Sequence, residues 1–397
     1  MNTQQLGGLC AKIGSGATPR GGEKVYQREG VALIRSQNIT NDGFTFDGLV
    51  YIDTAHADQL ANVTVATRDV LLNITGESVA RVCQVPDGVL PARVNQHVAI
   101  IRPHPDRLDP GYLRYTLASP ETQARLHGLA SAGATRRALT KQMIASLAFH
   151  LPALDEQRVI AGVLGALDDK IELNRRLNET LEELARLRFD SAQRSSVLPL
   201  NELVTLARDT VDPGSERDQR FEHFSIPAFD DGQTPVVEPG SAIKSSKLVV
   251  PPEAVLLSKL NPRIPRVWLS DLRDARRPIC STEFLVALPT ERSSREFLYC
   301  LFRSNSFVDD FAGRVAGTSG SHQRVRAVDA LSIEVPVPDQ HDLAELTALL
   351  RPLLDRAAAN RRESRTLAEL RDTLLPKLIS GELRVRDIES SVGASGA

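Results

Sequence analysis

Apolar residues along this chain follow two patterns: short runs typical of β-strands, and long three–four spacings typical of helices. The short runs fall in residues 1–150 and again in 197–338, between turns that contain glycine. We expect strands at Val31–Ile34, Val70–Leu72, His97–Ile101, Lys247–Val250, Val255–Leu257 and Phe284–Leu288. One helix is predicted inside each region, near Pro110–Leu129 and Arg295–Val308.

Two much longer helical patterns follow these regions, near Asp155–Ala192 and Leu343–Ile379. The first apolar seam comprises Ile160, Leu164, Leu167, Ile171, Leu177, Leu181 and Leu184. The second comprises Leu343, Leu346, Leu350, Leu353, Ala357, Leu367, Leu374 and Leu378. At 1.5 Å per residue, about 35 residues form a rod of about 50 Å. Because few globular domains need such length, we expect the two helices to pack on each other as a coiled-coil-like spacer.

Prolines modify the second long helix. Pro352 is predicted to kink it near its start, and Pro376 is predicted to help end it. Beyond the helix, the small and polar residues of the C-terminal tail predict disorder.

The chain also repeats itself. Residues 174–184 and 360–370 are identical at seven of eleven positions, at an offset of 186 residues, and Pro152 falls on Pro338 at the same offset. Chance similarity of two helices rich in leucine and arginine is the alternative explanation. Because the offset stays constant from the preceding strand into the helix, we favour duplication of a domain together with its helix.

The predicted fold class is α+β, with two mixed α/β domains separated by two long antiparallel helices and related by a pseudo-twofold repeat. The predicted domains are residues 1–150 and 197–338, the spacer helices occupy 151–196 and 339–388, and the tail is 389–397. Asn174 and Asn360 fall near the centres of the helices, close to both seams. They either meet at one level and fix the register of the pair, or face solvent beside their arginine neighbours.

Composition narrows the function classes. The chain has 397 residues, 42% of them hydrophobic, with a formal net charge of −2, so two or three globular domains are expected and overall charge does not indicate a polyanion binder. No apolar run is long enough to span a bilayer, the N-terminus lacks the features of a signal peptide, and the four cysteines have no metal or disulfide spacing. These features predict a cytoplasmic protein.

Catalytic motifs are absent from the sequence. The glycine-rich stretch around Arg20 fits neither a phosphate-binding loop nor a dinucleotide fingerprint, because Glu23 and Pro19 occupy decisive positions. Histidines and cysteines form no zinc motif, and no nucleophile elbow is present. Asn261-Pro262-Arg263 lacks the second proline and the aromatic residue of an amino-methyltransferase motif. The residues therefore predict no catalytic, metal or cofactor site in this chain, and an enzyme stays open as an alternative at this point.

Basic residues gather locally despite the near-neutral total. Residues 244–277 carry eight basic and three acidic groups, together with the only tryptophan, Trp268. Arginine, lysine, asparagine and serine contact phosphates and base edges, so this segment predicts a nucleic-acid surface, although a solvated charged face is the ordinary alternative for any one residue. The candidate contacts here are Lys244, Lys247, Ser258, Lys259, Asn261, Arg263, Arg266 and, near the domain end, Arg324.

The first domain carries 15 basic and 12 acidic groups in residues 1–150, and its polar clusters border predicted strands. Each cluster is therefore expected at a strand end or in a loop. Buried amides that satisfy backbone groups are the alternative explanation. The candidate DNA contacts are Arg20, Arg35, Gln37, Asn38, Asn73, Thr75, Arg93, Asn95, Gln96, Arg136 and Arg137.

Several segments together resemble one known family, the specificity subunits of type I restriction–modification systems. Residues 152–157 (Pro-Ala-Leu-Asp-Glu-Gln) open the first long helix, and residues 374–383 (Leu-Leu-Pro-Lys-Leu-Ile-Ser-Gly-Glu-Leu) close the second. Residues 224–228 and 258–263 are also similar to one class of the family's recognition domains. The second helix departs from the pattern because residues 338–342 lack the Glu-Gln of the first. That departure puts its docking to partner subunits in doubt.

The resemblance implies a non-catalytic protein whose two domains each read half of a split, asymmetric double-stranded DNA site. Partner modification subunits would bind the helices at Leu167, Ile171, Asn174, Leu181, Leu353, Asn360, Leu367 and Leu374, and would carry S-adenosylmethionine. A restriction subunit would add ATP- and magnesium-dependent cleavage. A scaffold that joins two protein-binding modules, or an unrecognised DNA enzyme, are the alternatives. The net charge predicts that this chain alone binds DNA weakly.

Overall fold

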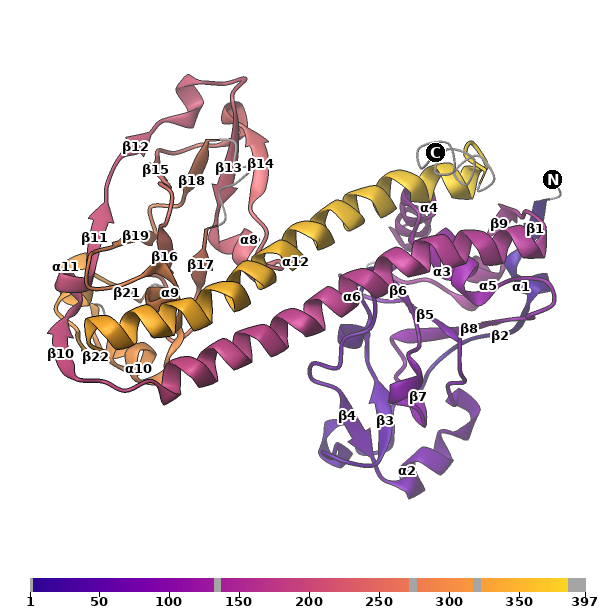
Figure 1. The fold of residues 1–397 in the computed structure, drawn as a ribbon. Helices are drawn as coiled ribbons and strands as arrows, with labels where there is room; N and C mark the ends of the chain where they lie inside the picture. Colours follow the sequence, from indigo (N-terminus) through magenta and orange to yellow (C-terminus); the bar gives the residue numbers. More distant parts are fainter. Residues whose placement is uncertain (1–2, 132–136, 271–276, 317–322, 385–397) are drawn as a thin grey trace, which may run out of the picture. The chain divides into compact units, whose positions relative to one another are not determined.

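The computed structural model describes residues 3–131, 137–270, 277–316 and 323–384. It divides into unit 1, Met1–Ile171 with Thr366–Ala397, and unit 2, Glu172–Arg365. Each unit combines one predicted mixed region with one end of each long helix. The predicted class, mixed α/β regions with two long helices, is confirmed (Figure 1).

Unit 1 contains a four-stranded sheet of order β2-β8-β5-β6, a three-stranded sheet β4-β3-β7 and the pair β1-β9. Its strands are β1 Thr3–Gln5, β2 Cys10–Ser15, β3 Val31–Ile34, β4 Val50–Ile52, β5 Val70–Asn73, β6 Val82–Gln84, β7 Ala92–Val94, β8 Val98–Pro103 and β9 Ala148–His150. Leaving aside short 3-10 turns and the long helix, the helices of unit 1 are α1 Leu6–Leu9, α2 Thr54–Gln59, α3 Pro110–Ala118, α4 Pro120–Ser131 and α5 Lys141–Ala145.

Unit 2 contains a four-stranded sheet of order β11-β19-β16-β17, a five-stranded sheet β12-β15-β18-β13-β14 and the pairs β10-β22 and β20-β21. Its strands are β10 Ser196–Pro199, β11 Val204–Ala207, β12 Thr210–Val211, β13 Arg220–Phe224, β14 Val236–Pro239, β15 Lys247–Val249, β16 Val255–Ser258, β17 Val267–Leu269, β18 Pro278–Cys280, β19 Phe284–Pro289, β20 Val315–Ala316, β21 Arg324–Val325 and β22 Glu334–Val337. Its helices are α7 Leu200–Leu203, α8 Ile226–Asp230, α9 Arg295–Arg303, α10 Asn305–Gly313 and α11 Ala327–Leu331.

The two units share one framework. β2, β8, β5 and β6 of unit 1 correspond in order to β11, β19, β16 and β17, and both four-stranded sheets are antiparallel throughout. In the three-stranded sheet of unit 1 and the five-stranded sheet of unit 2, a parallel pair, β3–β7 or β13–β18, carries an antiparallel neighbour. The closing strands begin at Ala148 and Glu334, which preserves the offset of 186 (334 − 148). The internal duplication inferred from the helices therefore extends to the domains.

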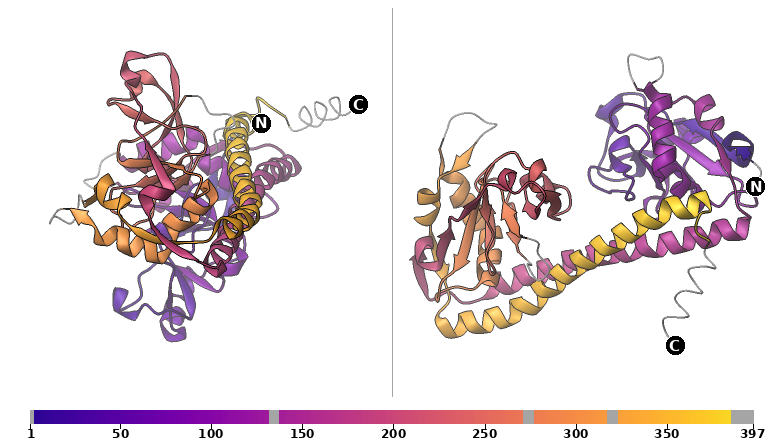
Figure 2. Two further views of the ribbon diagram at one scale, coloured as in Figure 1. Left: turned by 60° about the vertical axis from the view of Figure 1, so that its left-hand side comes forward. Right: turned by 90° about the horizontal axis from the view of Figure 1, so that it is seen from above.

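The long helices are α6 Leu154–Ser191 and α12 Gln340–Ser380, and they lie side by side within each unit (Figures 1 and 2). Pro376 does not end α12, because its neighbours Leu375 and Leu378 are buried in the core of unit 1. Burial of two leucines offsets the roughly 3 kcal/mol that an interior proline costs a helix. α12 is also assigned as one unbroken helix through Pro352.

The predicted seam of α6 is wrong at its end. Leu184 is 39% exposed, whereas Ala185 and Phe189 are buried. The Phe189 ring lies 5.4 Å from that of Phe297 on α9, so packing against α9 moves the buried stripe by one residue. In α12, similarly, Leu354 is buried more deeply than the predicted Leu353.

Two single helices predicted from periodicity are each broken in two. Ser119, between α3 and α4, has an extended ψ of 143°, as expected for a residue before proline. Ser304 breaks the α9–α10 pair at the corresponding place with the same ψ of 143°, although no proline follows it. Its hydroxyl donates to the Leu301 carbonyl at 2.8 Å and satisfies the end of the helix.

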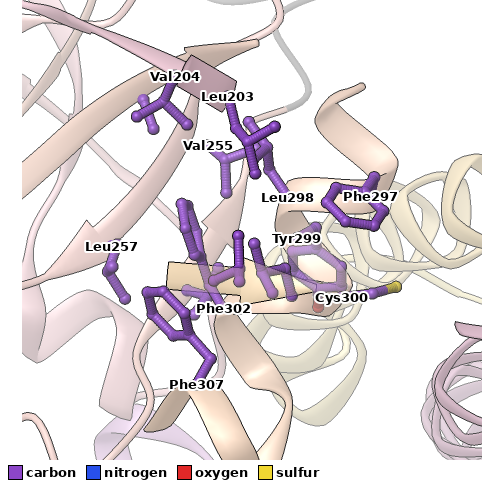
Figure 3. Packing of buried hydrophobic residues seen from close by; sticks show 14 of the residues in the cluster. Leu203, Val204, Val255, Leu257, Phe297, Leu298, Tyr299, Cys300, Phe302 and Phe307 are labelled. Carbon is purple, nitrogen blue, oxygen red and sulfur yellow. The ribbon is translucent and has the colours of Figure 1, made fainter. Parts of the chain in front are cut away.

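The first helix of each pair packs on the four-stranded sheet, α3 on β5 and β6, and α9 on β16 and β17. In unit 2 this brings Phe297, Leu298 and Phe302 together with Val255 and Leu257 (Figure 3). The same cluster continues into the long helices through Phe189 and Leu350. The core of each unit therefore includes the helix pair, so each mixed region is firmly attached to it.

Candidate nucleic-acid interface

The most basic polar loop of unit 2 connects β16 to β17 and is held at both ends. At its start, the buried Ser258 hydroxyl accepts the Leu260 amide at 3.2 Å. Asn261 adopts a left-handed φ of 51°, and its amide donates to the Gln323 carbonyl at 2.9 Å. These contacts turn the chain sharply, and the central residues are left on the surface.

The end of this loop is fixed by an ion pair. Arg266 is 8% exposed and binds Asp230, the last residue of α8, through two hydrogen bonds of 2.7 and 2.9 Å. Trp268 follows in β17 and packs edge-on against Phe224 and Phe229. Ser258, Arg266 and Trp268 are thus parts of the loop's support, and Trp268 is not available to stack on a base.

Arg263 is exposed, and Lys259 is half-buried beside the loop. Arg324 is exposed and pairs with Glu283 through two bonds of 2.9 Å, and this arginine lowers the pKa of the Glu283 carboxyl. Lys244 is exposed. Lys247 is buried, donates to Ser245, and has a pKa lowered by that burial. Lys259, Asn261 and Arg263 therefore form the accessible part of the connection between β16 and β17, which we call the proline loop after Pro262 and Pro265. Lys244 and Arg324 are exposed outside this loop.

In unit 1, buried asparagines organise the corresponding region. Asn38 is completely buried, donates to the carbonyls of Thr45 and Asp47 at 3.1 and 3.2 Å, and accepts the Arg35 amide at 3.0 Å. Asn73, also buried, ends β5 and donates to the Ser36 carbonyl at 2.8 Å. Both asparagines therefore support loops, as the alternative explanation anticipated.

Arg35 and Gln37 converge on one backbone group of unit 1. Both donate to the Gly48 carbonyl, at 2.6 and 3.3 Å, and the Arg35 guanidinium lies 5.4 Å from the centre of the Tyr26 ring. Gly48 has a φ of 64°, and a Cβ atom there would lie 2.4 Å from the Gln37 amide nitrogen. Glycine is thus required, and residues 35–48, here called the amide loop, present one arginine and one glutamine.

A second polar group of unit 1 centres on His97, which sequence reasoning left out of the candidate list. Its ring nitrogens lie 2.6 Å from the Thr75 hydroxyl and 3.0 Å from the Gln96 amide. Asn95 is buried and accepts the His97 amide at 3.1 Å. The available signal for His97 was its place directly after Asn95 and Gln96 in the same polar cluster.

The remaining candidates of unit 1 are dispersed. The Arg93 side chain donates to the Ala57 and Ala92 carbonyls, which makes it a support of α2. Arg137 is exposed and lies 4.0 Å from Glu77, and Arg20 is exposed. Arg136 lies outside the described residues.

The two central asparagines of the helices are buried and face each other in unit 2. The Asn174 amide donates to the Asn360 carbonyl at 3.4 Å, to Glu363 at 2.9 Å and to Ser364 at 3.3 Å. The Asn360 amide donates to Asn178 at 2.9 Å. Ser364 and Asn178 are themselves related by the offset of 186, so the two asparagines make equivalent contacts. The register interpretation is confirmed, and the solvent alternative is wrong.

Of the other helix positions, Leu167, Ile171, Leu181, Leu353, Leu367 and Leu374 are all half-buried. Within unit 2, Glu182 of α6 binds Arg361 of α12, whereas Asn174, earlier in α6, binds Ser364, later in α12. These segments of the two helices are therefore antiparallel. Half-burial leaves part of each side chain free for a partner chain.

Gln157 of the Asp-Glu-Gln motif is 1% exposed and joins α6 to the mixed α/β region of unit 1. Its carbonyl accepts the Asp109 amide at 3.0 Å, and its amide donates to Pro152 at 3.0 Å. The corresponding residue of unit 2, at the offset of 186, is the apolar Leu343, which is also buried. Gln157 thus makes internal contacts in unit 1, whereas an apolar side chain occupies the corresponding position of unit 2.

Ion pairs that the sequence did not indicate join each region to the long helices. In unit 1, Arg114 of α3 and Arg371 of α12 both bind Asp168 of α6; Arg371 lies at 2.9 Å. In unit 2, Arg303 of α9 and Arg361 of α12 both bind Glu182 of α6; Arg303 lies at 2.8 Å. We call these the unit 1 triad and the unit 2 triad.

The described residues carry no metal site and no membrane-spanning helix, since no group of histidine, cysteine or acidic residues there could hold a metal ion and no helix there could cross a membrane. Burial raises the pKa of the Cys83, Cys280 and Cys300 thiols to about 12, so these groups are poor nucleophiles.

Comparison with known proteins identifies the fold and the family. Residues 1–183 match the family model described as type I restriction modification DNA specificity domain. This match places a type I restriction–modification specificity domain in residues 1–183. The specificity subunit of the restriction enzyme MjaIX from Methanocaldococcus jannaschii is 26% identical over 309 residues, 70% of each chain. That of HindI from Haemophilus influenzae is 33% identical over 99 residues, 25% of this chain and 22% of that one.

The fold of this chain agrees with a solved relative. The type I restriction–modification S subunit from M. genitalium superposes with a TM-score of 0.63 at 15% identity, covering 95% of this chain and 96% of that one. The family that residues 152–157 and 374–383 indicate is thus confirmed. Because the relatives that this chain matches are specificity subunits, which do not catalyse, the prediction of a non-catalytic chain is confirmed.

Proposed function

We propose that this chain reads a bipartite, asymmetric double-stranded DNA site and positions adenine-methyltransferase subunits on it. Each mixed region would read one half-site, and the helix pair would separate the two halves by a stretch of unread base pairs. The observation that carries the proposal is one shared framework that presents two chemically different loops, the amide loop and the proline loop.

The proline loop has the features of a base-reading element. Its ends are immobilised by Ser258 and by the Arg266–Asp230 ion pair, so little conformational entropy is lost when it binds. Arg263 is exposed at its centre, with Asn261 and Lys259 beside it. Arginine can bind guanine through two hydrogen bonds and asparagine can bind adenine in the same way, whereas lysine neutralises phosphate.

Unit 1 offers different chemistry. Arg35 and Gln37 meet at the Gly48 carbonyl, and Gln96, His97 and Arg137 lie at strand ends or in loops. A glutamine–arginine surface and an asparagine–arginine–lysine surface offer different donor and acceptor patterns to a groove. The two half-sites should therefore differ in sequence.

Exposed leucines on the helices support docking of partner proteins. Leu173, Leu184 and Leu187 of α6 are 58%, 39% and 50% exposed, and their spacing of eleven and three places them along one helical stripe. Isolated apolar residues are normal on surfaces, but a stripe on a long helix fits a partner helix. The proposed partners are modification subunits that bring S-adenosylmethionine, and restriction subunits where the system has them.

The deciding experiment is co-expression with the modification subunit, followed by mapping of methylated adenines. We expect methylation at one split sequence, only in the presence of both proteins. Replacing residues 197–338 by those of a relative should change one half of the sequence and leave the other half intact. A change in both halves or in neither would refute the division of labour between units.

The same preparations separate the proposal from a scaffold role. Copurification with a partner but no sequence-dependent methylation and no DNA binding would favour a scaffold. DNA modification by the chain alone would indicate an enzyme. The chain's net charge of −2 leads us to expect weak DNA binding without the partner, and much tighter binding with it, in a titration at fixed salt.

A further inference from the structure

The unit 1 triad is a largely buried ionic group. The side chains of Arg114, Asp168 and Arg371 are 10%, 15% and 14% exposed. The Tyr115 hydroxyl also donates to Asp168 at 2.7 Å, and the Arg114 guanidinium lies 4.4 Å from the centre of the Tyr115 ring. Asp168 thereby contacts one helix of the recognition region and one helix of the spacer.

The unit 2 triad has the same composition. The Glu182 side chain is 19% exposed and forms ion pairs with Arg303 and Arg361. The Arg303 guanidinium also donates to the Tyr299 hydroxyl at 2.5 Å. In both units the carboxylate belongs to α6, one arginine to the recognition region and the other to α12. A tyrosine of the recognition helix accompanies both.

Duplication does not account for this similarity. At the offset of 185 that relates α3 to α9, Arg114 corresponds to Tyr299. At the offset of 186 that relates the long helices, Asp168 and Arg371 correspond to Leu354 and Ala185. In the same way, Arg303 and Glu182 correspond to Ala118 and Ala368. Each triad therefore stands at positions where the other half carries mostly nonionic residues, and the same arrangement arose twice.

Stability alone is also a poor explanation. Removing charges from water costs several kcal/mol per ion, and a well-packed apolar replacement is often neutral or stabilising. Unit 2 shows that this framework accepts Leu354 and Ala185, both buried, where unit 1 carries the ions. What a charge-assisted arginine–carboxylate pair adds is direction, since its hydrogen bonds tolerate little rotation, whereas apolar contacts allow sliding.

We infer that Asp168 and Glu182, each held between two arginines, are positioning residues that set the orientation of each recognition region on the helix pair. This inference rests on the proposed function. Successive base pairs are about 3.4 Å apart along one strand, so a small rotation of a recognition region moves its loop to the next base pair. The triads would thus restrict the enzyme to one number of unread base pairs between half-sites.

The test uses the full chain with its modification subunit and a set of DNA duplexes. The duplexes keep both half-sites and differ by one base pair, longer or shorter, in the unread segment. For Asp168→Asn and, separately, Glu182→Gln, we expect the preference for the native spacing to fall by about tenfold, the equivalent of one charged hydrogen bond. The half-site sequences should stay unchanged, and Asp168→Glu should restore part of the preference.

Matched controls are the adjacent, exposed positions Asp169→Asn and Glu183→Gln, which should leave the preference unchanged. Circular dichroism confirms that each variant is folded. If folded Asp168→Asn and Glu182→Gln lose overall methylation but keep the native preference for spacing, the triads are only structural and the inference is refuted. If the unaltered chain together with its modification subunit gives no methylation of any split site, the proposed function fails instead.

Discussion

The amide loop of unit 1 and the proline loop of unit 2 are supported by different forces. In unit 1 the amide loop is held by Asn38, a neutral group with three hydrogen bonds and no exposed surface. In unit 2 the proline loop is held by Arg266 and Asp230, of which Asp230 is 49% exposed. Neutral internal bonds respond little to salt, whereas a half-exposed ion pair is screened. The comparison shows that one framework can carry loops with unequal sensitivity to conditions.

The largest effect is expected in unit 1. Asn38→Ala removes three hydrogen bonds and leaves backbone groups of the amide loop without partners, at a cost of about 3 kcal/mol in local stability. Hydrogen–deuterium exchange should show faster exchange in residues 35–48 and unchanged exchange in residues 255–269. Gln37→Ala, at an exposed position of the same loop, is the control, and equal protection in both variants would contradict the role of Asn38.

A smaller effect is expected in unit 2. Asp230→Ala leaves the buried Arg266 guanidinium without its carboxylate. Because water reaches this pair, we expect the local stability of the proline loop to fall by only about 2 kcal/mol. The proline loop should exchange faster at residues 258–266, and raising the salt concentration should narrow the difference from the unaltered chain. Asp231→Ala, next in the chain and exposed, should have no such effect. A difference that is independent of salt would remove the contrast between the units.

Exposed side chains should affect DNA binding without affecting stability. Arg263→Ala should weaken binding of the complex by about 1–3 kcal/mol if Arg263 reads a guanine, and should relax preference at that base. If it contacts phosphate, the loss should be uniform across sequences and the salt slope should fall by about one. Arg266→Ala should weaken binding only together with faster exchange of the loop. Unaltered binding by Arg263→Ala would exclude that residue from the interface.

The smallest expected effect is on how the stability of unit 1 depends on pH. Burial tends to raise the pKa of Asp168, but Arg114, Tyr115 and Arg371 outweigh it and hold the folded pKa below the ordinary value. The ionised carboxylate therefore stabilises the fold above about pH 4, and this contribution is lost as the pH falls towards the folded pKa. Urea unfolding of Asp168→Asn between pH 3 and 7 should show a weaker pH dependence than the unaltered chain. Identical slopes would mean that folding does not lower the pKa of Asp168.

Helix bounds could be predicted where the sequence has a strong periodic or repeated pattern. The long helices observed at Leu154–Ser191 and Gln340–Ser380 lie within a few residues of the expected bounds, because a seam repeated over many turns leaves little ambiguity. The repeat placed Asn174 and Asn360 at equivalent helix positions, but whether they meet or face solvent was decided only by the structure. Leu184 was assigned to the seam wrongly, since the ring of Phe297, far away in sequence, determines which side of α6 is covered.

Site residues were predictable as clusters but not as individuals. An asparagine or arginine beside a strand can support a loop or face DNA, and composition does not distinguish the two. Asn38, Asn73 and Lys247 are buried, whereas Gln37, Gln96 and Arg263 are exposed. The candidate list combined both kinds because burial depends on neighbours supplied by distant strands.

The sequence by itself determined the duplication, the two long helices, the family and the absence of familiar catalytic motifs. Each of these rests on local periodicity or on residues adjacent in the chain. The tertiary structure alone decided which polar groups support loops, where the helices meet α3 and α9, and how Asp168 and Glu182 each gather two arginines. Those contacts join residues up to 203 positions apart, as between Asp168 and Arg371, and long-range packing, which no local pattern encodes, brings them together.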